Sequence, residues 1–107
     1  MCQLQKNDGG DMKRIEIIGN KSIEEDLFDM FKKKNIANYY TKIPVVHGVG
    51  SSGPRNGDHI WPEENFLIIV YCDEKEVEDI KNTISELKEY FKDEGIKFFE
   101  TDIVCCL

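Results

Sequence analysis

The chain has 107 residues, enough for one domain with a single hydrophobic core but too few for two. Apolar residues make up 40% of it and charged residues 33%, a composition typical of chains that fold. The net charge of −7 argues against broad contact with nucleic acid or anionic lipid, which both select clustered Lys and Arg. Because the sequence has no apolar run of about 20 residues and no secretory signal, we expect a cytoplasmic protein without membrane insertion.

The four cysteines form no CxxC pair, and free thiols are expected in a reducing compartment. The adjacent Cys105 and Cys106 could instead bind a soft metal or pair between subunits.

The first third of the chain predicts a strand and a helix. Residues 1–12 show no hydrophobic period and are expected to be a flexible leader, which leaves 13–107 as one domain. β-branched residues predict a strand over 13–19. Ser22 and Glu25 predict a capping box that opens a helix, and three lysines at 32–34 mark its last turn.

The remaining elements are two strands, a helix and a fourth strand. Residues 39–47 predict a strand that contains Pro44, which cannot donate a ladder hydrogen bond and so belongs at a sheet edge or a bulge. Residues 66–72 are almost continuously apolar, as in a central strand. A second capping pair, Asp73 with Glu76, opens a helix that ends near Gly95, and 96–104 predict the last strand.

The order of these elements, βαββαβ, predicts a ferredoxin-like α+β sandwich with a four-stranded antiparallel sheet. Right-handed crossovers place the first and third strands in the middle and the other two at the edges. Both helices then cover one face. The other face retains apolar side chains and both edges stay open, so we expect a homo-oligomer.

Between the second and third strands lies a long connection, His47–Asn65, with the sequence HGVGSSGPRNGDHIWPEEN. Connections in small domains usually have about 4 to 6 residues, so we place the function here. Its imidazoles and carboxylates are ligands that suit Zn, Cu, Ni or Mn. The candidate metal ligands are His47, Asp58, His59 and Glu63. Alternatively, the histidines only form hydrogen bonds that fold the loop.

Several segments resemble the PII signal-transduction superfamily. MKRIEII at 12–18 resembles the family's opening strand, VHGVG at 46–50 resembles the VKGFG that ends its second strand, and residues 47–65 take the place of its T-loop. The HGxGxSGPRxGDHxWPEEN pattern is most similar to PII-like proteins, some of which are linked to metal transport. CutA-type metal-tolerance proteins share the topology.

The resemblance implies a non-enzymatic homotrimer that binds a small effector, usually an adenine nucleotide, between subunits. The T-loop of such a protein regulates a membrane transporter or an enzyme. Glycines there let backbone N–H groups approach a phosphate, although they could equally serve only to turn the strand into the loop. The resemblance assigns ligand binding to His47, Gly48, Gly50, Arg55, Gly95 and Lys97, and partner contact to Arg55 and Trp61.

The chain also departs from nucleotide-binding PII proteins. Their TGxxGDGKIF segment is reduced to residues 93–98, and the chain stops at Leu107 without the basic C-terminal loop that clamps phosphates. A smaller or less charged ligand than ATP is therefore equally compatible. The sequence contains no GxSxG, GxxxxGK[ST] or HExxH pattern, and we expect no enzyme activity. The alternative function is a CutA-like metal-binding protein that uses His47 and His59.

Overall fold

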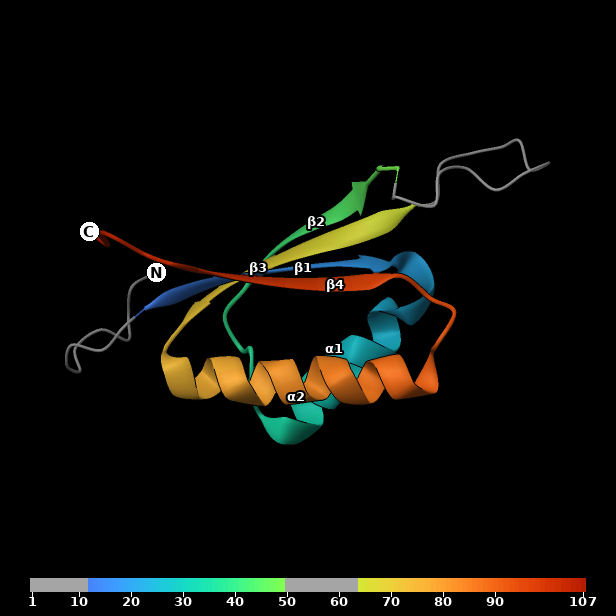
Figure 1. Cartoon of the computed structure of the whole chain (residues 1–107), viewed down its shortest axis with the longest axis horizontal. Helices are drawn as coiled ribbons and strands as arrows, with labels where there is room; N and C mark the ends of the chain where they lie inside the picture. Colours follow the sequence, from blue (N-terminus) through green and yellow to red (C-terminus); the bar gives the residue numbers. More distant parts are fainter. Residues whose placement is uncertain (1–11, 50–63) are drawn as a thin grey trace.

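The computed structural model describes residues 12–49 and 64–107. In these ranges four strands and two α-helices follow the predicted order (Figure 1). The helices are α1 (Glu24–Lys34), preceded by the 3-10 turn η1 (Lys21–Ile23), and α2 (Glu74–Tyr90). The strands are β1 (Lys13–Asn20), β2 (Thr41–Val46), β3 (Asn65–Cys72) and β4 (Ile96–Asp102).

The strands form one antiparallel sheet in the order β2-β3-β1-β4. This order confirms the ferredoxin-like arrangement, with the first and third strands central. Pro44 lies in the edge strand β2, and the pairing of β2 with β3 shifts register between Ile43 and Val46. The position fits a residue that has no N–H to donate to a neighbour.

The core lies between the sheet and the two helices, which cover the same face of it (Figure 1). Alternate residues of β1 and β3, such as Ile17 and Ile68, are fully buried against the helices because side chains of a strand alternate between its faces. α2 contributes the predicted stripe, of which Ile80 and Leu87 are at most 1% exposed. In the described part of the chain no helix is long and apolar enough to cross a membrane.

The helix caps differ from the predicted ones at α1. The prediction of a capping box formed by Ser22 and Glu25 is wrong. Asn20 is the N-cap of η1 instead, and its Oδ1 accepts a hydrogen bond from the Ser22 N–H at 2.9 Å. At α2 the prediction is confirmed, because Asp73 Oδ1 accepts from the Glu76 N–H at 2.9 Å. Asparagine and aspartate both cap well because a short side chain brings an oxygen to the free N–H groups of the first turn.

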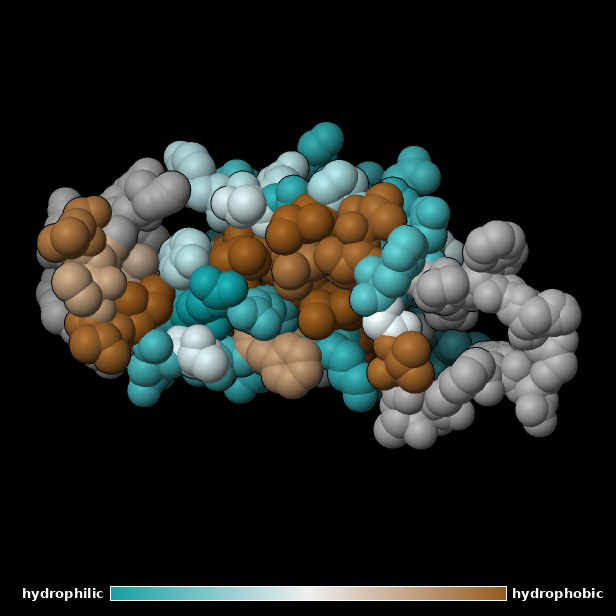
Figure 2. Space-filling model, turned by 90° about the horizontal axis from the view of Figure 1, so that it is seen from above, coloured by the Kyte–Doolittle hydropathy of each residue, from teal (hydrophilic) through white to brown (hydrophobic). Residues whose placement is uncertain are grey.

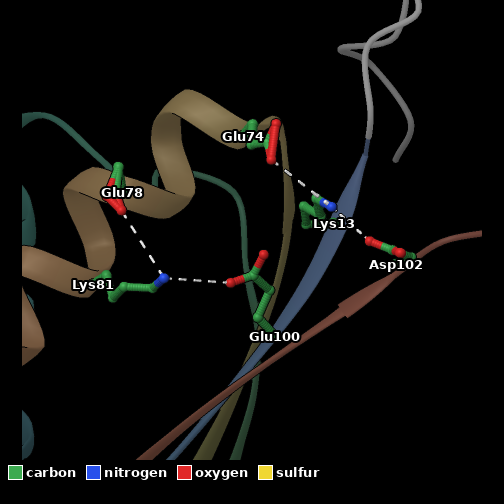
Figure 3. Close-up of polar contacts among 6 residues, drawn as sticks. All are labelled: Lys13, Glu74, Glu78, Lys81, Glu100 and Asp102. Atoms are coloured by element: carbon green, nitrogen blue, oxygen red, sulfur yellow. Dashed lines mark hydrogen bonds and ion pairs between the residues drawn. The ribbon is translucent and has the colours of Figure 1, made fainter.

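Two lysines tie α2 to the sheet on the side of β4 (Figure 3). Lys13 of β1 pairs with Asp102 of β4 and lies 4.0 Å from the Glu74 carboxylate of α2. Lys81 of α2 lies 3.7 Å from the Glu100 carboxylate of β4. The acidic partners of Lys13 are largely exposed, and water screens such pairs, so they contribute little to stability. The position of the edge strand β4 is set by its backbone pairing with β1.

The cysteines follow the prediction in part. Cys72 and Cys105 carry free thiols, whereas Cys106 is disulfide-bonded, and the expectation of a free thiol is wrong for Cys106. Burial among apolar side chains, helped by the nearby Glu76 and Asp73 carboxylates, raises the pKa of the Cys72 thiol to about 12. Cys72 is therefore a protonated core residue at neutral pH, not a nucleophile.

Candidate functional site at the loop end of the sheet

Four of the predicted ligand residues lie in the described ranges. His47 and Gly48 follow β2 directly, Gly95 immediately precedes β4, and Lys97 is its second residue. All four are exposed. The other predicted ligand, metal and partner residues, Gly50, Arg55, Asp58, His59, Trp61 and Glu63, lie outside the described residues, and their roles stay predictions.

His47 and Gly48, after β2, lie at the same end of the sheet as Gly95 and Lys97, at the start of β4, but the two pairs lie at opposite edges. A row of backbone neighbours crosses this end: Val46 pairs with Asn65, Asn65 with Asn20, and the Asn20 N–H donates to the Gly95 carbonyl at 3.0 Å. Neighbouring strands are about 4.8 Å apart, so three steps separate the ends of the row by roughly 14 Å. One subunit therefore does not bring the residues that follow β2 together with those around the start of β4.

Gly48 and Gly95 have no packing reason to be glycine. A Cβ built at either position meets no atom of residues 12–49 and 64–107 within 4 Å, and neither glycine adopts the left-handed φ that favours glycine. Both backbones are consequently open to approach from outside the subunit. This is the condition that a backbone N–H needs to reach a phosphate oxygen.

The face of the sheet opposite the helices carries a central apolar patch that no described helix or strand covers (Figure 2). Leu67 of β3 lies at its centre, paired with Ile18 of β1 on one side and Ile43 of β2 on the other. Ile43 and Phe99 are 41% and 49% exposed. Lys97 lies at the β4 end of the same row, because it pairs with Ile18. The expected half-covered sheet is thus present, and it carries one of the predicted ligand residues.

Contacts that the sequence did not predict join the same end of the sheet. The Lys21 N–H donates to the Glu64 carbonyl, just before β3, at 3.1 Å. Ser22 Oγ donates to Glu94 Oε1 at 2.7 Å, and this bond ties the turn before β4 to η1. The sequence signal for this corner is Asn20 at the end of a strand, two residues before a serine, a common side-chain cap.

A charged cluster lies where β2 passes the start of α1. The Glu24 carboxylate pairs with Lys42 of β2 and lies 3.5 Å from the Lys21 ammonium group. Lys42 also lies 5.5 Å from the centre of the Phe28 ring, a cation–π contact. Burial alone would raise the pKa of Glu24, but the hydrogen bond from Lys42 and the charges of Lys42 and Lys21 lower it below the ordinary 4.5.

The cluster makes stability depend on pH. A carboxylate with a lowered folded pKa adds stability above its unfolded pKa and loses that stability as the pH falls through the folded value. We therefore expect Glu24→Gln to lower the free energy of unfolding by about 1 kcal/mol at pH 7. The difference in free energy of unfolding between the variant and the parent should become smaller below pH 4.5. Urea unfolding between pH 3 and 7 tests this. The exposed neighbour Glu25→Gln is the control, and an equal deficit for Glu24→Gln at every pH would contradict the assignment.

The predicted metal site cannot be assembled from the described residues alone. Among residues 12–49 and 64–107 no group of three or more His, Cys, Asp or Glu side chains is arranged to hold a metal ion. His47 is the only one of the four candidate ligands that these ranges include.

Comparison with known proteins identifies the family. The sequence profile of the family Nitrogen regulatory protein P-II matches residues 12–104. The chain belongs to this family. The match spans all four strands and both α-helices, and it confirms the resemblance seen in the opening strand and at the end of β2. No curated protein matches the sequence.

Solved structures share the P-II fold with this chain. CPII from Thiomonas intermedia K12 bound to ADP and bicarbonate is 24% identical, with a TM-score of 0.64 over 87% of this chain and 86% of that one. CPII bound to ADP, AMP and bicarbonate is 22% identical, with a TM-score of 0.62 over 87% and 92%. A DUF3240 family protein from Shewanella baltica OS155 is 12% identical, with a TM-score of 0.64 over 89% and 92%. At these identities the likeness establishes the fold.

Proposed function

We propose that this P-II family member is a non-enzymatic cytoplasmic signalling protein. It forms a homotrimer and binds an adenine nucleotide, or a related small effector, between subunits. His47 and Gly48 of one subunit and Gly95 and Lys97 of its neighbour line this site. Residues 47–65 serve as the T-loop, and Arg55 and Trp61 contact the regulated transporter or enzyme.

One observation carries the proposal: the two described parts of the site lie at opposite edges of one sheet. A neighbouring copy whose β4 edge lies beside the β2 edge of the first copy would bring the two parts together. The apolar row of Ile43, Leu67 and Ile18 is not fully buried in the subunit, and it gives that packing a driving force because apolar surface removed from water stabilises by roughly 25 cal/mol per Å². The site would then be complete only in the oligomer.

The open backbones at Gly48 and Gly95 and the ammonium group of Lys97 support an anionic ligand. The structures of CPII, which share this fold, contain ADP, and one of them also contains AMP. A diphosphate or monophosphate needs less compensating charge than a triphosphate. We therefore propose ADP or AMP as the effector in preference to ATP.

Isothermal titration calorimetry of the full chain tests the proposal. We expect ADP or AMP to give saturable heat with one site per subunit. Lys97→Ala should weaken binding by about 10- to 150-fold, because a hydrogen bond from a charged donor is worth roughly 1.5–3 kcal/mol. Lys92→Ala, which removes an exposed lysine just beyond α2, should bind like the parent.

Titration with Zn, Cu and Ni distinguishes the proposed nucleotide-binding function from the alternative, a metal-binding protein. Heat from a metal but from no nucleotide, abolished in His47→Ala and His59→Ala variants, would reject the proposal in favour of a metal-binding protein. Nucleotide heat preserved in His59→Ala, which lies outside the proposed nucleotide site, would exclude a metal site built on both histidines as the basis of binding.

A further inference from the structure

The corner that joins β1 to α1, residues 20–22, is hydrogen-bonded both to the turn before β4 and to the residue before β3. Its Asn20 N–H donates to the Gly95 carbonyl and its Lys21 N–H to the Glu64 carbonyl. Its Ser22 hydroxyl donates to the Glu94 carboxylate at 2.7 Å. The corner is closed on itself by the N-cap bond from the Ser22 N–H to Asn20 Oδ1.

We propose that this 20–22 corner is a positioning element for the ligand site. It holds the turn before β4, at Glu94 and Gly95, and the start of β3, at Glu64, as one unit. This inference rests on the proposed function and deepens it, because it gives a route by which a ligand bound at Gly95 affects the chain at Glu64, where the long connection between β2 and β3 ends.

The link is short and mostly backbone. Asn20 and Lys21 are adjacent, so their two N–H groups, one bonded to Gly95 and the other to Glu64, move together unless the corner itself deforms. Ser22 makes the third tie through its side chain, and it is exposed, so its removal creates no core cavity. Ser22 therefore acts through the turn and does not itself need to touch the ligand.

A ligand-free measurement tests the link first. We expect Ser22→Ala to speed hydrogen exchange at the Asn20 and Lys21 amides by about 5-fold each, which corresponds to the loss of one hydrogen bond. Ser22→Thr keeps the hydroxyl and should restore both rates. Ser85→Ala, at an exposed serine on α2, is the control and should leave both rates unchanged. Faster exchange at Asn20 alone, or at neither amide, would overturn the proposal.

Calorimetry with ADP tests the role in binding. Ser22→Ala should weaken ADP binding by about 5-fold, and Ser22→Thr should restore it. Unchanged affinity in Ser22→Ala would overturn the positioning role. If the parent protein binds no adenine nucleotide, the proposed function fails, whereas the exchange rates still decide whether the corner joins the two contacts.

Discussion

Glutamate in place of Leu67 is expected to dissociate the proposed trimer into folded monomers. Leu67 lies at the centre of the open face, between Ile18 and Ile43, and its side chain is only partly buried in the subunit. Leu67→Glu therefore leaves the core beneath the helices intact. At an interface between copies, however, each carboxylate would be buried without a partner, which costs several kcal/mol per site. Sedimentation equilibrium should show three times the monomer mass for the parent and the monomer mass for the variant.

The matched control places the same charge on the other side of the molecule. Ser85→Glu adds a carboxylate to the exposed side of α2 and should remain trimeric. Circular dichroism should show the same helix content for both variants. A monomeric parent, or a Leu67→Glu protein with the parent's mass, would contradict the assignment of the open face to contacts between copies.

Much of the fold could be predicted because its signals are local. The unbroken apolar run of β3 and the proline in β2 give central and edge positions from residue type alone. The helix stripe of α2 is equally clear, although the helix ends at Tyr90 and not near Gly95. The turn that follows is too short to show a period, and strand and helix ends are set by such turns.

The candidate site was less predictable because its arrangement depends on contacts between distant segments. The family resemblance indicates His47, Gly48, Gly95 and Lys97, but the separation of the two pairs across the sheet follows only from the strand order.

The sequence pattern favours the wrong cap at the corner that begins at Asn20, because Ser22 and Glu25 also match a capping box. The choice of Asn20 as the cap depends on where β1 ends, which the pairing of β1 with β3 decides. A local pattern therefore could not distinguish the two caps.

Gly19→Ala is expected to lower the free energy of unfolding by about 1–3 kcal/mol, as overpacking a core does. A Cβ at this position would lie 2.7 Å from Phe66 Cζ, 3.0 Å from Phe66 Cε2 and 3.4 Å from Ile23 Cδ1. Phe66 is fully buried, so a shift of its ring away from the added Cβ would disturb the packing of the core. For a domain of this size the midpoint of thermal unfolding should fall by roughly 4–8 °C per kcal/mol.

Gly48→Ala and Gly95→Ala are the controls, because a Cβ at either position meets no atom of the described part of the chain within 4 Å. Their free energies of unfolding should stay within about 0.5 kcal/mol of the parent value. The difference in free energy of unfolding would show that the core requires glycine at position 19, whereas the fold of the subunit does not require glycine at positions 48 and 95. A thermal midpoint for Gly19→Ala equal to that of the parent would show that Phe66 can move aside. The close approach of β1 to the Phe66 ring would then not contribute to the packing of the sheet against η1.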